Sequence, residues 1–141
     1  MSQQLPHPLP VTDATVLDLY GHLFAPWVKT LGLRDFSVRP GEASAVLPHG
    51  ETLQLYAGAV CGQVIMAAVD TVITLAMFTT DRIPKGTVYQ HTHFLRPAVD
   101  DDLRVSARVL RFGKGSAFAE ADVTLVGSGV LVARASSEFA F

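Results

Sequence analysis

The chain of 141 residues is long enough for one domain with its own hydrophobic core; 49% of its residues are hydrophobic and only 17% are charged. A chain this apolar is expected to bury part of its surface between subunits. Its net charge of −2 argues against a nucleic-acid partner. The single cysteine, Cys61, excludes an internal disulfide and a zinc cluster built from cysteines, and it is typical of a reducing compartment such as the cytoplasm.

The N-terminal segment MSQQLPHPLP lacks both the basic part and the apolar part of a signal peptide. We interpret residues 1–11 as a flexible, proline-stiffened arm and residues 12–141 as a single domain. A first helix follows, capped by Thr12 or Asp13, with an apolar face made of Val16, Leu17, Leu19, Tyr20, Leu23 and Phe24. A short helical piece over 26–32 begins with a proline and ends with a glycine.

The central part of the chain predicts two strands and then a long helix. Residues 33–48 alternate in hydrophobicity about a Pro-Gly turn, which is typical of a strand pair. Residues 57–79 are almost continuously apolar and predict the longest helix. This run approaches membrane-spanning length, but Asp70 near its centre argues against a bilayer. We therefore expect no membrane partner and a cytoplasmic protein.

Further strands are predicted after the helix, over 87–97, 103–112, 116–126 and 130–141. The breaks between them are short and rich in Gly and Asp, so neighbouring strands should be antiparallel. Leu103, Val105 and Ala107 alternate with polar residues, which indicates one buried face and one wetter face. The predicted fold class is α+β, with an antiparallel sheet that covers one apolar helix.

Asp70 is the residue that this fold class does not explain. Helical spacing places it on one face with a small group of neighbours, namely Gln63, Met66, Ala67 and Thr74. In one interpretation the carboxylate bonds to nearby backbone, Thr71 or Thr74 and merely faces an interface. In the other, it serves as a general base or nucleophile, because isolated carboxylates in apolar surroundings are suited to that chemistry. The residue pattern alone leaves both open.

Several segments occur in a characteristic order: a glycine before an apolar helix ending in A-x-D-T, then HFLRPA, VLRFGKG and GVLVARASSEFAF. In this order they resemble hotdog-fold acyl-CoA thioesterases of the phenylacetyl-CoA-type, PaaI-like branch, over roughly Leu31 to Phe141. The resemblance implies a sheet wrapped around the long helix, and active sites formed between subunits of a homodimer or homotetramer. It also implies hydrolysis of an acyl- or aroyl-CoA, with no metal and no cofactor besides the coenzyme A of the substrate.

The resemblance assigns roles to individual residues. Asp70 matches the family's catalytic base or nucleophile. Gly62 matches the glycine at the helix start whose backbone N–H holds the thioester oxygen as negative charge develops. Thr87 matches a Ser or Thr that assists the water or carboxylate from the neighbouring subunit. Met66 is expected to line the acyl slot.

The segment before the helix departs from the family pattern. Many members carry His-Gly-Gly where this chain has Cys61, Gly62 and Gln63, and an Asn where it has Leu55. We expect Cys61 and Gln63 to contact substrate, although Gln63 could instead make an interface hydrogen bond. The departures keep open a non-catalytic acyl-CoA-binding module. A hotdog dehydratase or hydratase ranks last, because that chemistry needs a histidine beside the carboxylate.

Basic residues are the candidates for binding the phosphates of coenzyme A. Arg96, Arg111 and Lys114 match the family in position, and such side chains at strand ends and hairpins reach phosphates. The alternative is that they are ordinary solvated charges. The GKG segment around Lys114 lacks the glycine spacing and the following helix of a phosphate loop, so it predicts a turn.

The remaining polar candidates have simpler interpretations. His91 and His93 form an H-x-H pair that could bind a metal, but without a third ligand a surface or interface role is favoured. Cys61 is more readily a buried thiol than a nucleophile. The loop of His49 and Glu51 either edges the substrate cleft or is simply exposed. Residues 100–102, three aspartates, predict an exposed turn.

Overall fold

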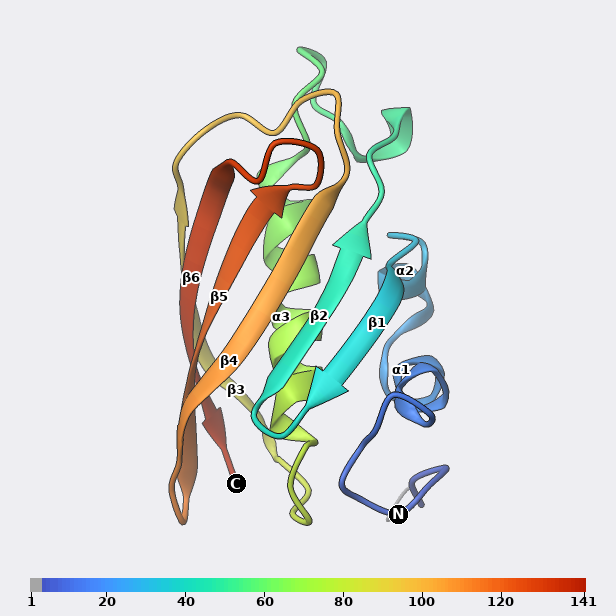
Figure 1. The fold of residues 1–141 in the computed structure, drawn as a ribbon, viewed down its shortest axis with the longest axis vertical. Helices are drawn as coiled ribbons and strands as arrows, with labels where there is room; N and C mark the ends of the chain where they lie inside the picture. Colours follow the sequence, from blue (N-terminus) through green and yellow to red (C-terminus); the bar gives the residue numbers. More distant parts are fainter. Residues whose placement is uncertain (1–3) are drawn as a thin grey trace.

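A computed structural model describes residues 4–141 (Figure 1). Within this range, one antiparallel sheet has the strand order β1-β2-β4-β5-β6-β3. Its strands are β1 (Arg34–Arg39), β2 (Glu42–Leu47), β3 (Gly86–Phe94), β4 (Leu103–Phe112), β5 (Ser116–Leu125) and β6 (Leu131–Ala140). The helices are α1 (Val16–Leu23), α2 (Pro26–Lys29) and α3 (Gly62–Met77), with a 3₁₀ turn at Glu51–Leu53. In Figure 1 the sheet lies across α3, and α1 and α2 lie beside β1.

This arrangement confirms the predicted α+β layout. α3 is apolar nearly all round because the sheet curves about it, and most of its residues are buried. The sheet can approach closely because many residues that face the helix are alanines, among them Ala43, Ala45, Ala107, Ala117, Ala119, Ala121, Ala133 and Ala135. No helix in the described part of the chain is long and apolar enough to cross a membrane.

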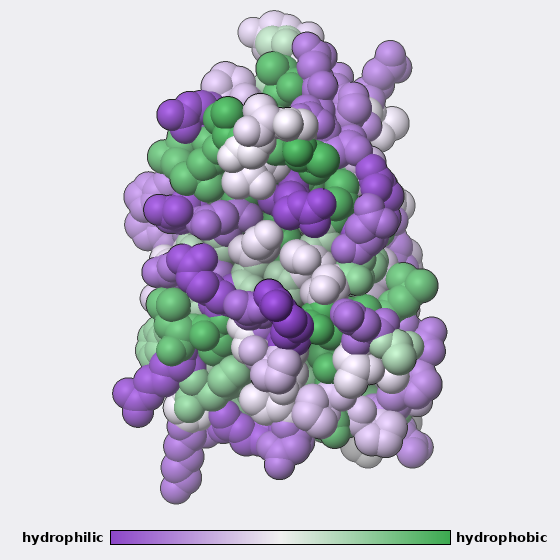
Figure 2. All heavy atoms as spheres, in the orientation of Figure 1, coloured by the Kyte–Doolittle hydropathy of each residue, from purple (hydrophilic) through white to green (hydrophobic). Residues whose placement is uncertain are grey.

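The opposite face of the sheet carries the polar residues of the alternating strands. Arg108 pairs with Glu120, and Arg134 Nε lies 2.8 Å from Asp122 Oδ1. Figure 2 shows this face, where hydrophilic side chains are interspersed with hydrophobic ones. It is therefore a mixed surface and not a second apolar core.

The long helix begins later than its apolar run predicts. The prediction was 57–79, whereas α3 spans Gly62–Met77. The residues before it form a small hairpin: the Leu55 N–H donates to the Ala59 carbonyl at 2.7 Å, and Gly58 has a φ of +88°. That φ suits glycine and breaks a helix. Tyr56 is fully exposed at the tip of this hairpin.

The start of the domain also differs from the expectation. The N-cap of α1 is Thr15, and it makes no side-chain capping bond. Asp13 does not cap the helix, because its carboxylate accepts the Val38 N–H at 2.7 Å and so ties this segment to β1. Leu17, expected on the apolar face, is 64% exposed.

The N-terminal arm is described from residue 4 onward; residues 1–3 lie outside the described part. Leu5 and Leu9 pack against the core, and the Val11 N–H donates to the Phe78 carbonyl at 2.9 Å. The described portion of the arm therefore lies against the domain, close to the C-terminal end of α3.

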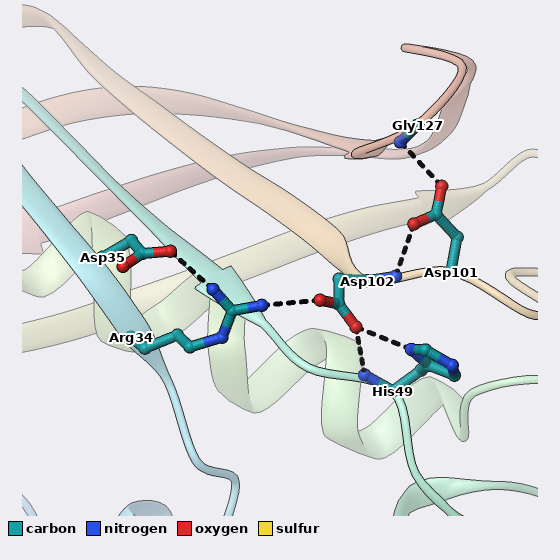
Figure 3. Close-up of polar contacts among 6 residues, drawn as sticks. All are labelled: Arg34, Asp35, His49, Asp101, Asp102 and Gly127. Atoms are coloured by element: carbon teal, nitrogen blue, oxygen red, sulfur yellow. Dashed lines mark hydrogen bonds and ion pairs between the residues drawn. The ribbon is translucent and has the colours of Figure 1, made fainter.

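A polar network joins the loops around the start of β1, the end of β2 and the start of β4 (Figure 3). The Asp102 carboxylate accepts His49 Nδ1–H at 2.6 Å, the His49 backbone N–H at 3.0 Å and Arg34 Nη2–H at 2.6 Å. Asp101 accepts the Gly127 N–H at 2.7 Å, where a Cβ on residue 127 would come within 2.9 Å of the carboxylate. The turn over 100–102 therefore holds three loops together through hydrogen bonds, and His49 is one of the residues in this network.

The His49 hydrogen bonds, and then the nearby Arg34 cation, hold the pKa of Asp102 below its usual value of 3.8, against the opposing effect of burial. We therefore expect Asp102→Asn to lower the free energy of unfolding by about 1–2 kcal/mol at neutral pH. A depressed pKa stabilises the fold above the unfolded-state value and loses this effect as pH falls through the folded-state value. Urea unfolding should show a constant gap from wild type above about pH 5 and a shrinking gap below 3.8.

The matched control for this prediction is Asp100→Asn. Asp100 is exposed and has a φ of +57°, which asparagine also adopts. The same loss of one carboxylate there should leave stability nearly unchanged. An equal loss in both variants would show that the network around Asp102 contributes nothing specific.

Candidate functional site

The accessible positions of α3 form one stripe. Every residue of the helix is buried except Gly62, Gln63, Met66, Ala67, Asp70 and Thr74. Five of these were placed on one face by helical spacing, and the structure confirms that face. The stripe borders β3, because the Gln90 amide donates to the Met66 carbonyl at 3.3 Å. Since β3 is an edge strand, the stripe lies beside an open edge of the sheet.

Asp70 is positioned by a contact across this border. The Thr87 hydroxyl donates to Asp70 Oδ1 at 2.8 Å. The hydroxyls of Thr71 and Thr74 bond instead to backbone carbonyls one turn earlier, those of Ala67 and Asp70. Among residues 4–141, Asp70 Oδ2 accepts no hydrogen bond. The half-buried carboxylate is therefore held through one oxygen while the other is available.

The contact with Thr87 corrects one expectation. The resemblance implied that Thr87 would reach the carboxylate of a neighbouring subunit. The bond to Asp70 lies within one chain, because β3 begins beside the middle of α3. A bulge between Thr87 and Tyr89 turns the strand at this point, and it leaves Thr87 on the helix side.

Gly62 occupies the first position of α3. The preceding Cys61 has extended backbone angles, φ −60° and ψ 136°, and gives no side-chain cap. Within the described residues, the Gly62 N–H therefore has no acceptor, as is usual for the first turn of a helix. A Cβ on residue 62 would lie 3.4 Å from the Phe94 ring. This N–H group therefore lies close to Phe94, the last residue of β3.

Gly62 and Asp70 are separated by eight positions on one helix. At 1.5 Å per residue, this places them about 12 Å apart along the axis. A reacting thioester needs its oxyanion donor and its base each about 3 Å away. One chain alone therefore does not bring these two groups to the same thioester.

Cys61 precedes α3 and Gln63 belongs to its first turn, at the end of the stripe away from Asp70. The Cys61 thiol donates to Gln63 Oε1. Both residues line a groove of about 600 Å³ between α2, the 3₁₀ turn and α3, together with Trp27, Leu53 and Gln54. Met66 lies on the stripe and is 42% exposed.

The three basic candidates are divided between the two ends of the sheet. Arg96 follows β3 and donates to the Leu131 carbonyl at 2.8 Å. Arg111 and Lys114 belong to the β4–β5 hairpin, where Arg111 lies opposite Phe118 and Phe118 opposite Glu138. From Leu131 to Glu138 the strand rises by about 23 Å. One chain does not gather the three cations at one phosphate.

Two basic residues that the sequence analysis missed lie near the hairpin. Arg82 donates to the Lys114 carbonyl at 3.0 Å and stacks over the Phe141 ring at 4.3 Å. Lys85 is joined to the end of β6 through its backbone N–H. Neither forms an ion pair with a carboxylate of the described chain. The only sequence signal was the basic content of the segment DRIPKG after the long helix.

The histidines lie elsewhere. His91 and His93 pair with Ser136 and Arg134 of β6, and these partners are exposed on the face opposite α3. His49 belongs to the Asp102 network. Within residues 4–141 of one chain, no group of three or more His, Cys, Asp or Glu side chains is arranged for a metal ion.

Comparison with known proteins identifies the family. The family model of the thioesterase superfamily matches residues 57–132, more than half of the chain. The chain belongs to the thioesterase superfamily. Among curated proteins, none matches the sequence.

Solved structures give the fold. A conserved protein from Pseudomonas aeruginosa is 27% identical over 84% of this chain and 94% of its own, with a TM-score of 0.76. Thioesterase superfamily member 2 from zebra fish is 23% identical over 93% and 99%, with a TM-score of 0.84. The PaaI protein from the phenylacetic acid degradation operon of E. coli is 19% identical over 90% of each chain, with a TM-score of 0.80. The predicted hotdog fold is confirmed.

Proposed function

We propose that this protein hydrolyses acyl- or aroyl-CoA thioesters at sites formed between the subunits of a homodimer, which could pair further into a homotetramer. The observation that carries the proposal is the Asp70 carboxylate, the one ionisable side chain of α3, held by Thr87 with its second oxygen available. Membership of the thioesterase superfamily supports thioester chemistry at this position. A single unpaired cysteine suits a cytoplasmic location.

Asp70 has two routes to hydrolysis. As a general base it takes a proton from water, whose oxygen attacks the thioester carbon; the carbonyl electrons move to oxygen and then return as the C–S bond breaks. The leaving thiolate takes up the proton, which gives a carboxylic acid and free coenzyme A. As a nucleophile, Asp70 attacks the thioester carbon and the C–S bond breaks, which gives a mixed anhydride and the coenzyme A thiolate; water then opens the anhydride to the carboxylic acid, Asp70 returns as a carboxylate, and the proton released from water is taken up by the thiolate. Neither route uses a metal or a redox cofactor.

The oxyanion needs a donor near Asp70, and the Gly62 N–H of the same chain is about 12 Å away along the helix. We therefore assign the donor to Gly62 of the second subunit. In this arrangement Asp70 and Thr87 form one half of each site, and a helix N-terminus from the other copy forms the second half. The positive end of that helix favours the developing negative charge.

The open edge of β3 supports this pairing. The strand has nine residues, and its large apolar side chains Val88, Phe94 and the following Leu95 are 50–56% exposed. A long apolar edge with unpaired backbone groups favours addition of another strand. Antiparallel pairing of two copies reverses the strand direction, so Phe94 and Gly62 of one copy approach Thr87 and Asp70 of the other.

The same pairing accounts for the divided basic residues. Reversal of the second copy brings its Arg96 to the end of the sheet where Arg111 and Lys114 of the first copy lie. Arg82 and Lys85 join the group at this end. Five cations from two chains form a suitable surface for the phosphates of coenzyme A.

The alternative is a module that binds acyl-CoA without turnover. It is favoured by Cys61 and Leu55, which stand where many relatives carry a histidine and an asparagine. The dehydratase alternative has less support, because the hydrogen-bond partner of the Asp70 carboxylate is Thr87 and not a histidine.

The direct test is hydrolysis of short, medium and aromatic acyl-CoA esters, followed by thiol release, with binding of each ester measured by calorimetry. We expect turnover of at least one class. Binding without turnover would replace the hydrolase with the binding module. Neither binding nor turnover for any ester would overturn both.

A further inference from the structure

The groove beside the start of α3 is next to the proposed oxyanion donor. It lies between α2, the 3₁₀ turn and α3, and its volume of about 600 Å³ is within the range typical of ligand pockets. Cys61 and Gln63 both line it, and they are the residues on either side of Gly62 in the chain. Gln63 also belongs to the accessible stripe of α3. The groove and the stripe therefore share Gln63 and meet at the start of the helix.

The side chains that line the groove carry no formal charge. Apolar surface comes from Trp27, Leu31, Leu53 and Val64, and the other lining residues are threonines, glutamines and Cys61. An acyl group that ends in a carboxylate would lose water there without gaining an ion pair, which costs free energy. An uncharged acyl group would bury apolar surface instead. The lining of the groove therefore favours uncharged acyl groups.

Trp27 is the aromatic residue of this lining, and it is 57% exposed. Two hydrogen bonds hold its short helix against α1: Lys29 Nζ donates to the Gly21 carbonyl, and the Tyr20 hydroxyl donates to the Val28 carbonyl at 3.4 Å. The ring is therefore carried by a fixed segment of backbone. Such a ring stacks on a flat acyl group with little loss of conformational entropy.

In the proposed dimer, the two copies offer different surfaces to one thioester. Most of the cations assigned to the phosphates come from the copy that supplies Asp70. The uncharged groove belongs to the copy that supplies Gly62, because Cys61 and Gln63 flank that residue. A thioester whose oxygen is bonded to the Gly62 N–H thus has a basic surface for its coenzyme A and an apolar groove for its acyl group.

We infer that this groove binds the acyl group, that it prefers an uncharged acyl group with an aromatic ring, and that Trp27 determines this preference. The inference rests on the proposed function, since it takes acyl-CoA as the ligand and Gly62 as the donor to the thioester oxygen. Met66, one turn along the stripe from Gln63, is then at the entrance of the groove and not inside it.

Trp27 is the only tryptophan of the chain, so its fluorescence reports on the groove. The probes are ketone analogues of acyl-CoA esters, in which a methylene between the sulfur and the carbonyl prevents hydrolysis. The phenylacetyl analogue should shift the Trp27 emission and bind at least about tenfold more tightly than the acetyl and glutaryl analogues. Free coenzyme A should bind more weakly and leave the emission unchanged.

Three variants of the full-length protein separate the ring from the rest of the site, with binding measured by calorimetry. Trp27→Ala should weaken binding of the phenylacetyl analogue about tenfold and that of the acetyl analogue less than about twofold. Leu17→Ala shortens a similarly exposed side chain on α1 and is the matched control, which should bind as wild type. Thr52→Lys adds a cation to the lining and should improve binding of the glutaryl analogue by about twofold to fivefold.

The outcomes distinguish this inference from the proposed function. An unchanged emission with analogues that bind, equal affinity for all three analogues, or wild-type binding by Trp27→Ala would overturn the groove and leave hydrolysis standing. An emission shift together with loss of the preference in Trp27→Ala supports the groove even if no ester is hydrolysed. If neither coenzyme A nor any analogue binds, the groove and the proposed function are overturned together.

Discussion

Replacement of Asp70 by asparagine is expected to lower kcat for acyl-CoA hydrolysis by about 10²–10⁴ with little change in KM. Asparagine has the same shape and still offers an oxygen to the Thr87 hydroxyl, so the local packing should survive. It lacks the basic oxygen that takes a proton or attacks the thioester. The effect should therefore appear in the chemical step, measured as steady-state release of coenzyme A with the best ester of the panel.

The control for this variant is Asp100→Asn, which makes the same change at an exposed position far from the stripe. Both variants should sediment and unfold thermally like wild type. If Asp70→Asn kept more than a tenth of the activity, the carboxylate would have only a structural role. The Asp70–Thr87 hydrogen bond would then be a packing feature of the sheet edge.

The second large effect concerns a backbone group. Gly62→Pro removes the N–H at the first position of α3, where proline is well tolerated. Cys61 already has the extended angles favoured before a proline. We expect kcat to fall by about 10²–10³, the usual loss when an oxyanion donor is removed. Gly62→Ala keeps the N–H and adds a comparable contact with Phe94, so it separates the donor from the steric effect.

Mixing experiments test whether Gly62 and Asp70 act across the interface. Chains carrying Gly62→Pro and chains carrying Asp70→Asn should each be nearly inactive alone. After joint dissociation and reassociation in equal amounts, about a quarter of the activity should return, because half of the dimers are mixed and each has one intact site. No recovery, despite mixed dimers visible by native mass spectrometry, would place both groups in one chain's site or remove Gly62 from the mechanism.

Periodicity was enough to predict the architecture and the accessible face of α3. The strand alternation at Leu103, Val105 and Ala107 fixed which side meets the helix, and all three are buried. The stripe through Met66 and Asp70 followed from helical geometry. These features were predictable because each depends on residues a few positions apart, whose relative directions the local backbone determines.

Other features depend on contacts that local patterns do not encode. The residues of the hairpin around Gly58 are as apolar as those of α3, so hydrophobicity alone does not show where the hairpin ends and the helix begins. The predicted helix therefore starts too early. Asp102 finds His49 and Arg34 across more than fifty residues of chain. The resemblance gave Thr87 a role but misplaced the chain it serves, since only the course of β3 beside α3 shows the contact with Asp70.

Gly62 and Asp70 lie on one helix, so in the proposed dimer the length of α3 between them sets the distance between the two sites to which they contribute. Adding or removing one residue between them would turn the remainder of the helix by about 100° and shift it by about 1.5 Å. Asp70 would then leave the stripe, and both sites of a symmetric dimer would be lost together. Relatives that keep this chemistry should therefore vary in the side chains between these two positions and not in their number.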